Sequence, residues 1–285
     1  MPAEPPIDVP SRLSEAYGLL ASGTVVPIAG GTDIMVRITG EIGPLPDRML
    51  DLSHLDALEG IALESGALVV GARTTYSEIR RSALCREHAA ALVEAAATVG
   101  AAQIQNRGTL GGNIANASPA GDMLPVLLAA DAEIVVGSHR GERSVPAAEF
   151  FPAYRQTALE ADELILRVRI PLPPGREMRF RKVGTRRAQA ISKVVMAVSW
   201  RSHGPSAGWS DVRVALGSVA ATPIRAAATE AVLEGARPSP ETADRAAETL
   251  AAEIHPIDDV RSTADYRRIV AARVLHRIVR DAGGW

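Results

Sequence analysis

The sequence predicts an α+β protein in two parts, and three observations lead to this prediction. In the first part, short apolar runs typical of strands are interspersed with segments whose apolar residues recur at helical spacing. The run PLPPG then interrupts the chain at about 171–176. Beyond it, strand-like runs come first and helices last, without the strict alternation of a doubly wound sheet. With 285 residues, 47% of them hydrophobic, the chain is long enough for one large domain or two medium ones.

The first part begins with a helix and a strand–glycine–helix unit. Segment 11–23 has apolar residues at helical spacing, with Ser11 as the candidate N-cap and Gly23 as a stop. VVPIA predicts a strand, GGT a turn and DIMVRI a helix. Further on we expect strands at 67–72, 133–138 and 163–170, helices at 84–99 and 122–130, and a polar, glycine-rich loop at 103–122.

The second part begins after the PLPPG run, a candidate domain boundary because three prolines and a glycine separate two strand-like segments. The pattern then predicts strands at 178–183, 193–200 and 212–219, followed by helices at about 222–234, 240–253 and 263–281. We therefore expect an α+β tail domain here.

Composition excludes several classes of partner. The net charge of −2 and the pI near 6.3 argue against binding to nucleic acid or an anionic membrane, which would need a strongly basic face. The first residues have no basic segment followed by an apolar one, and no later run reaches the roughly 18 apolar residues of a membrane span. We expect a cytoplasmic protein.

Cys85 is the only cysteine, so the chain can form neither an internal disulfide nor a multi-thiolate metal site. A redox-active thiol is one interpretation of Cys85. Its position in the helical run SALCREHAAALVEAAA favours the other, a small buried residue. Any redox centre must therefore be organic or belong to another chain.

The first glycine-rich segment is Ala29-Gly30-Gly31-Thr32-Asp33, between a strand and a helix. Adjacent glycines permit positive φ and let backbone N–H groups converge on an anion. Thr32 could add a hydroxyl donor, and Asp33 could cap the helix or bind a ligand hydroxyl. A tight strand-to-helix turn is the alternative. The Rossmann pattern G-x-G-x-x-G and the P-loop Gly-Lys-Ser/Thr are both absent.

The second glycine-rich segment runs from Thr109 to Asp122 and again carries a glycine pair, Gly111-Gly112. Its small residues allow close approach to a flat ligand, and Asn113, Ser118 and Asp122 offer directional hydrogen bonds. For Asp122 the alternative is a helix N-cap. Two such segments about 75 residues apart favour an extended ligand with a phosphate centre.

The segments PIAGGTDIMVRI and TLGGNIANASPAGDMLPVLLAADAEIVV resemble the two FAD-binding segments of the flavoprotein (medium) subunit of molybdopterin dehydrogenases, the xanthine and carbon monoxide dehydrogenase family. The resemblance extends to ELILRVRIP, FRKVGTRRAQAISKV, VRVALGSVAATPIRA and STADYRR, and so covers nearly the whole chain. It implies an FAD-binding fold of the vanillyl-alcohol oxidase type, residues 1–175, with subdomains at about 1–58 and 59–175. A C-terminal α+β domain of antiparallel strands and helices, 176–285, would follow.

The resemblance also implies the site. Carried over position by position, it assigns non-covalent FAD binding to Val26, Pro27, Ile28, Ala29, Gly30, Gly31, Thr32, Asp33, Val99, Thr109, Leu110, Gly111, Gly112, Asn113, Ala117, Ser118, Asp122, Ile165 and Lys182, and places Ile114 and Ala115 near the flavin ring. Lys182 would stabilise negative charge on the flavin or its phosphates, the alternative being a strand lysine that faces water. No substrate-converting residues and no metal ligands are expected on this chain.

The implied function is electron transfer. A molybdopterin-binding large subunit would oxidise the organic substrate, a small subunit with 2Fe-2S clusters would pass electrons singly, and FAD would collect them for NAD, a quinone or oxygen. The expected assembly is a dimer of heterotrimers. The competing hypotheses are a stand-alone flavin oxidase or reductase of the same fold and a flavin-free adaptor. The intact glycine pairs count against the adaptor.

Overall fold

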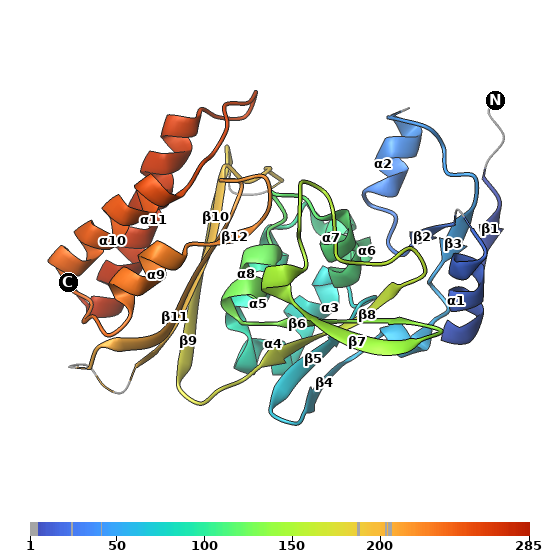
Figure 1. Cartoon of the computed structure of the whole chain (residues 1–285), viewed down its shortest axis with the longest axis horizontal. Coiled ribbons are helices and arrows are strands. Elements are labelled where there is room, and N and C mark those ends of the chain that lie inside the picture. Colours follow the sequence, from blue (N-terminus) through green and yellow to red (C-terminus); the bar gives the residue numbers. More distant parts are fainter. Residues whose placement is uncertain (1–4, 24, 41, 187–188, 203, 205–206) are drawn as a thin grey trace.

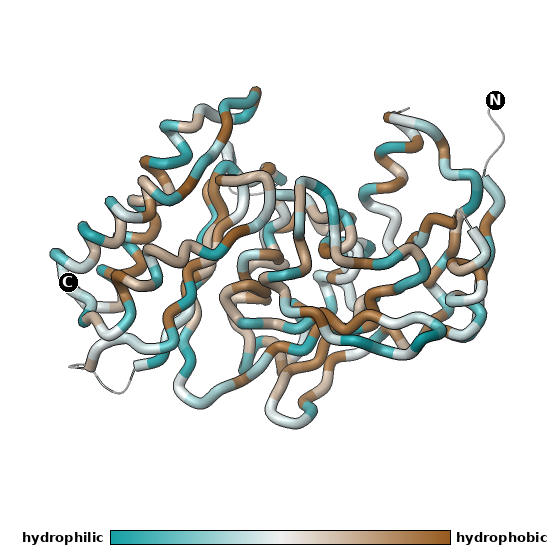
Figure 2. Tube along the Cα trace, in the orientation of Figure 1, coloured by the Kyte–Doolittle hydropathy of each residue, from teal (hydrophilic) through white to brown (hydrophobic). Residues whose placement is uncertain are grey.

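The chain is built around three β-sheets, which follow one another across the molecule (Figure 1). The computed structural model describes residues 5–23, 25–40, 42–186, 189–202, 204 and 207–285. The expected α+β class is confirmed, since helices and mainly antiparallel strands mix throughout. In Figure 2 the hydrophobic segments concentrate along the strands of the larger sheets and the helices packed on them.

The N-terminal sheet is small and parallel. Its order is β1-β3-β2, with β1 at Ile7–Asp8, β2 at Val26–Ile28 and β3 at Met49–Asp51. Helix α1 (Leu13–Ala21) follows β1, and α2 (Ile34–Thr39) follows β2, as the spacing predicts.

The expected cap of α1 is wrong. The N-cap residue is Arg12, which makes no side-chain cap bond, and Ser11 lies one residue earlier. The backbone N–H and the hydroxyl of Ser11 both donate to the Glu15 carboxylate instead, at 2.9 and 3.2 Å. A carboxylate in the first turn has thus taken up donors next to the helix start, and no hydroxyl cap is needed.

The central sheet is antiparallel in the order β4-β5-β8-β6-β7. Its strands are β4 (Ile61–Glu64), β5 (Ala67–Gly71), β6 (Glu133–Ser138), β7 (Gly141–Pro146) and β8 (Leu164–Pro171). One face packs under the helices of this part, and the other contacts α1 through Leu164 and Leu166. Short 3₁₀ turns lie at Asp56–Leu58 and Ala147–Glu149.

The helices on this sheet are α3 (Tyr76–Arg81), α4 (Ala83–His88), α5 (Ala90–Thr98), α6 (Ala102–Arg107), α7 (Leu110–Asn116) and α8 (Leu124–Ala129). The single helix expected at 84–99 is wrong. The backbone leaves the helical region at Ala89, with φ −144° and ψ 51°, and the helix divides into α4 and α5. No glycine or proline marks the break, so packing of the two short helices has overridden local propensity.

The C-terminal sheet is antiparallel in the order β12-β11-β10-β9. It comprises β9 (Arg176–Val183), β10 (Val194–Ser202), β11 (Trp209–Gly217) and β12 (Ile224–Arg225), followed by α9 (Ala227–Leu233), α10 (Pro240–Glu253) and α11 (Ala264–Gly283). The three expected strands and helices are present. The first helix begins at Ala227 rather than near 222, because Ile224 and Arg225 pair with β11.

The C-terminal sheet is covered on both faces. Val194, Met196, Val198 and Trp200 of β10 belong to the core under α9–α11. The alternate side chains of the same strand, Val195 and Ala197, belong to the core that contains α5 and α8. Both parts of the chain therefore contribute helices that pack on this sheet, one part on each face.

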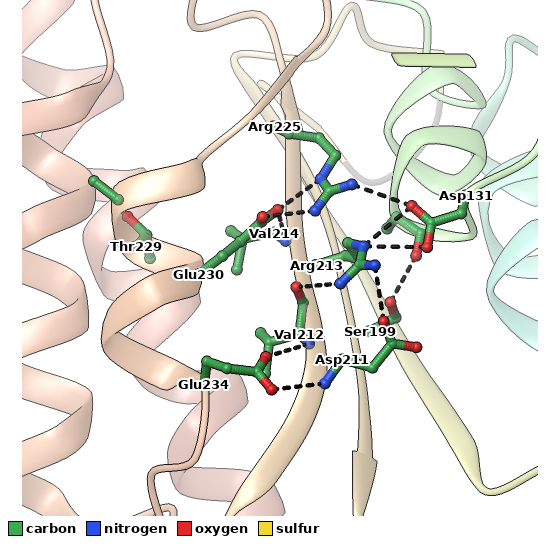
Figure 3. A network of polar contacts seen from close by, with 12 residues as sticks. Asp131, Ser199, Asp211, Val212, Arg213, Val214, Arg225, Thr229, Glu230 and Glu234 are labelled. Atoms are coloured by element: carbon green, nitrogen blue, oxygen red, sulfur yellow. Dashed lines mark hydrogen bonds and ion pairs between the residues drawn. The ribbon is translucent and has the colours of Figure 1, made fainter. Parts of the chain in front are cut away.

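A polar network fixes the end of α8 to this sheet (Figure 3). Asp131, just after α8, accepts from Arg213 at 3.1 Å, Arg225 at 3.1 Å and Arg176 at 3.3 Å. The Ser199 hydroxyl donates to the Ala129 carbonyl at 2.6 Å. Strands β9 to β12 thus all hold the C-terminal end of one short helix from the other part of the chain.

Candidate FAD site

A cavity of about 530 Å³ lies where the two glycine-rich segments meet the C-terminal sheet. Seven residues singled out from the sequence line it: Thr32, Asp33, Val99, Asn113, Ser118, Asp122 and Lys182. They come from segments up to 150 positions apart in the sequence. The fold therefore brings both segments and the FRKVG strand to one cavity.

The first segment leaves backbone donors free. Gly31 has φ +73°, the left-handed region that glycine adopts at least cost. A Cβ on Gly30 would lie 1.8 Å from the Arg107 carbonyl oxygen, so the turn packs directly on the backbone that leads into the second segment. Within the described structure, the N–H groups of residues 30–33 have no protein acceptor. Such convergent free donors suit an anionic group.

The second segment uses its donors internally. The expected loop at 103–122 is wrong in part, because it contains α6 and α7. Thr109 caps α7 by accepting from Gly112 N–H at 3.1 Å, and the N–H groups of Leu110 and Gly111 donate to carbonyls of Thr74 and Ala72 at 3.0 and 2.8 Å. The glycine pair here starts a helix against Ala72, just after β5, and needs no positive φ. Its geometry provides close packing rather than free backbone donors.

Side chains connect the two segments at the cavity. Asn116 donates to the Asp33 carboxylate at 2.9 Å and accepts from Arg155 at 2.9 Å. Asp33 makes no side-chain cap bond to α2. Asn113 hydrogen-bonds Tyr76, yet its Oδ1 is buried without a partner. Burial, and next the Asp33 charge, raise the pKa of the Tyr76 hydroxyl, so this group stays protonated.

Asp122 and Lys182 form a buried ion pair in the cavity wall. The Nζ of Lys182 lies 2.5 Å from Oδ2 of Asp122 and 3.0 Å from the Thr98 carbonyl oxygen. The Ser192 hydroxyl donates to the other carboxylate oxygen. Burial raises the pKa of Asp122, and Lys182 counteracts this rise. Neither alternative from the sequence holds: Asp122 is not the cap of α8, whose N-cap is Met123, and Lys182 does not face water.

The C-terminal wall of the cavity was missed in the sequence. It includes Ile191, Ser192, Ser218, Asp259 and Arg267. Arg267 is buried and donates to the Ser218 carbonyl at 2.7 Å and to Asp259 at 2.8 Å. A signal did exist, because Ser192, Ser218 and Arg267 lie within three of the stretches that carry the family resemblance. The resemblance assigned no role to these three residues.

The other residues named from the sequence are not among those that line the cavity: Val26, Pro27 and Ile28 on β2, Ala29, Gly30 and Gly31 in the turn, Thr109, Leu110, Gly111 and Gly112 at the start of α7, Ile114 and Ala115 within α7, Ala117 after α7, and Ile165 on β8. Ala117 ends α7 with φ +46°.

Cys85 is buried in α4, where burial raises the pKa of its thiol, as suits a structural residue. Across the described ranges, no cluster of three His, Cys, Asp or Glu side chains could hold a metal, and no helix is long and apolar enough to cross a membrane.

Comparison with known proteins identifies the family. Residues 7–173 match the FAD binding domain in molybdopterin dehydrogenase, and residues 179–282 match the CO dehydrogenase flavoprotein C-terminal domain. The chain belongs to this family of FAD-binding flavoprotein subunits. The expected family, FAD as cofactor and oxidoreductase class are confirmed.

Similar proteins span the same length. The nicotinate dehydrogenase FAD-subunit of Eubacterium barkeri is 33% identical over 95% of this chain and 94% of its own. The xanthine dehydrogenase FAD-binding subunit of Escherichia coli O157:H7 is 29% identical over 96% of each chain. The structure of carbon monoxide dehydrogenase from Hydrogenophaga pseudoflava that lacks the Mo-pyranopterin moiety matches with TM-score 0.92 and 30% identity over 97% and 96% of the two chains.

The residues present fit FAD. The free N–H groups of residues 30–33 suit a pyrophosphate, and the unpartnered Asn113 Oδ1 and the neighbouring small residues suit a planar, polar ring system. One segment offers free backbone donors and the other offers close packing with polar side chains. The two together suit a ligand that has a phosphate centre and a separate ring.

Proposed function

We propose that this chain is the electron-transfer subunit of a molybdenum hydroxylase complex. It would take electrons from 2Fe-2S clusters of a small subunit and pass them to an external acceptor: NAD, a quinone or oxygen. The single observation that carries this proposal is the cavity formed by both FAD-family segments and the C-terminal sheet. Bound FAD supplies the chemistry, since it accepts single electrons yet can deliver two as hydride.

The chain's own residues bind and orient the cofactor in this proposal. The first segment holds the pyrophosphate, while α7 with Asn113 and the Asp122–Lys182 pair holds the ring system. The full set we propose is the one named from the sequence, extended by Tyr76 and Ser192, which line the same cavity. The division into residues 1–58, 59–175 and 176–285 remains our proposal for the domains.

The names of the relatives, which are subunits or medium chains of dehydrogenases, support the proposed partners. We propose a 2Fe-2S small subunit and a molybdopterin-binding large subunit in a dimer of heterotrimers located in the cytoplasm. Substrate oxidation would take place on the large subunit, so this chain alone would convert no organic substrate.

The test is an anaerobic titration of the FAD-loaded chain with purines, aldehydes and N-heterocycles while the flavin absorbance is followed. We expect no bleaching by any of these substrates without partner subunits, but full bleaching by dithionite. Direct bleaching by a substrate would favour the stand-alone oxidase. A chain that binds no FAD would favour the adaptor.

A further inference from the structure

The ion pair in the cavity wall is nearly removed from water. The exposed fractions are 10% for the Lys182 side chain and 7% for that of Asp122. Four structural elements meet here, because Thr98 ends α5, Asp122 precedes α8, Lys182 lies on β9 and Ser192 on the β9–β10 connection. Removing two charges from water is costly, so such a pair needs good geometry or a purpose beyond stability.

The carboxylate is held from three sides. Oδ2 accepts from Lys182 at 2.5 Å and lies 3.2 Å from the Thr98 hydroxyl. Oδ1 accepts from the hydroxyl of Ser192, which is 1% exposed. These donors fix the orientation of Asp122 toward Lys182 and favour its ionised form.

The consequence is that Lys182 presents no free positive charge to the cavity. The sequence suggested that this lysine stabilises negative charge on the flavin, but the ammonium is neutralised by a carboxylate in direct contact. The other buried cation of the described lining, Arg267, is likewise paired, with Asp259 at 2.8 Å. The buried charges of the wall therefore cancel in pairs.

We propose that Asp122 sets the reduction potential of the flavin by screening Lys182, with Ser192 and Thr98 as positioning residues. This inference rests on the proposed function. Reduction adds two electrons from a one-electron donor and one proton from solvent to oxidised FAD, and so leaves one additional negative charge on it. A free ammonium nearby would stabilise that charge and raise the reduction potential of the flavin. An ammonium screened by Asp122 keeps the potential lower, so that reduced FAD donates its electrons to the acceptor more readily.

The central experiment is a double-mutant cycle on the FAD-loaded full chain, read as the midpoint potential in a dithionite titration with a reference dye. We expect Asp122→Asn to favour reduced over oxidised FAD by about tenfold or more, a rise of about 30 mV for a two-electron couple. The double variant Asp122→Asn/Lys182→Met should return close to the wild-type potential, because two uncharged side chains replace an ion pair that has no net charge.

The chain supplies a matched control, since Lys193 is its only other lysine. Lys193 lies against the Tyr266 ring at 4.8 Å and does not line the cavity, so Asp122→Asn/Lys193→Met should keep the raised potential. Ser192→Ala, which retains both charges, should raise the potential by a smaller amount, because without the hydroxyl donor the carboxylate is held less firmly against Lys182. A role in folding alone would not move the potential in this pattern.

The proposal is overturned by an unchanged or lowered potential in Asp122→Asn, or by a double variant that fails to restore it. Where Asp122→Asn binds FAD weakly, the dissociation constants of oxidised and reduced FAD give the same shift through a thermodynamic cycle. A wild-type chain without FAD would contradict the proposed function, whereas bound FAD with an insensitive potential would contradict only the role of the ion pair.

Discussion

Gly30 and Gly112 belong to the two glycine pairs but have different surroundings. A Cβ on Gly30 would lie 1.8 Å from a backbone carbonyl oxygen, which cannot move without shifting the chain. A Cβ on Gly112 would meet only the Thr109 hydroxyl oxygen, at 3.0 Å. The sequence predicts glycine pairs with similar roles, whereas the structure separates a glycine packed on backbone from one whose Cβ would meet a single side-chain atom.

This difference predicts that both variants lose FAD but that only the Gly30 variant loses much stability. Gly30→Ala should lower the free energy of unfolding by about 1–3 kcal/mol, as overpacking does, and reduce FAD content as well. Gly112→Val should change the free energy of unfolding by less than about 1 kcal/mol but still reduce FAD content, because a branched side chain fills space beside the cofactor segment. Urea unfolding without FAD and flavin absorbance after gel filtration measure the two quantities. Equal losses of stability in both variants would contradict the assignment.

At the scale of elements, periodicity explains what the sequence could predict. Helices α10 and α11 have long periodic patterns, strands β5, β6 and β10 have apolar runs, and each lies close to its expected range. Strand β7, GERSVP, was missed because it is a largely exposed edge strand without apolar alternation. Helix α7, LGGNIAN, was missed because two glycines lower its propensity. Its Thr109 cap and its backbone hydrogen bonds to Ala72 and Thr74, just after β5, stabilise it instead.

The candidate site divides in the same way. Its glycine-rich segments are contiguous motifs, so the sequence reveals them. Ser192, Ser218 and Arg267 stand singly in different elements and meet only after folding. Their convergence depends on the antiparallel register of the C-terminal sheet and on how α11 packs against it, and no local pattern specifies that packing.

Helix α8 packs against the C-terminal sheet, and an aspartate at each of its ends forms ion pairs with that sheet. Its first end carries Asp122, and its last end carries Asp131, on which three arginines converge. Asp131 also has φ +51°, which Asn tolerates as well as Asp. Asp131→Asn therefore removes the charge without straining the backbone.

We expect Asp131→Asn to lower the free energy of unfolding by about 1–2 kcal/mol, a value reduced from the fully buried case because its side chain is 35% exposed. The cause is the loss of the one carboxylate that all three arginines share, although Arg176 and Arg213 keep Asp211 as a partner and Arg225 keeps Glu230. Glu142→Gln, which removes a single exposed partner of Arg167, is the control and should cost less than about 1 kcal/mol. Urea denaturation measures both. Equal effects would mean that the Asp131 network is no stronger than an ordinary surface pair.

For the whole molecule, the distribution of cores decides how the chain folds. Phe180, Val195, Ala197 and Ala215 of the C-terminal sheet belong to the same core as α5 and α8. The opposite face of that sheet has its own core under α9–α11. The boundary at 171–176 is therefore a division in topology, whereas the packing crosses it.

The whole chain should consequently unfold in one transition. All three tryptophans, Trp200, Trp209 and Trp285, lie after the boundary, so tryptophan fluorescence reports the C-terminal part alone. Far-UV circular dichroism reports both parts. Because one shared core joins them, we expect the two signals to give the same urea midpoint in the FAD-free chain. Residues 176–285 expressed alone would expose the apolar face formed by Phe180, Val195 and Ala197, and we expect them to aggregate. Two separate midpoints, together with a soluble fragment that unfolds cooperatively, would show instead that the C-terminal sheet needs no cover from α5 and α8.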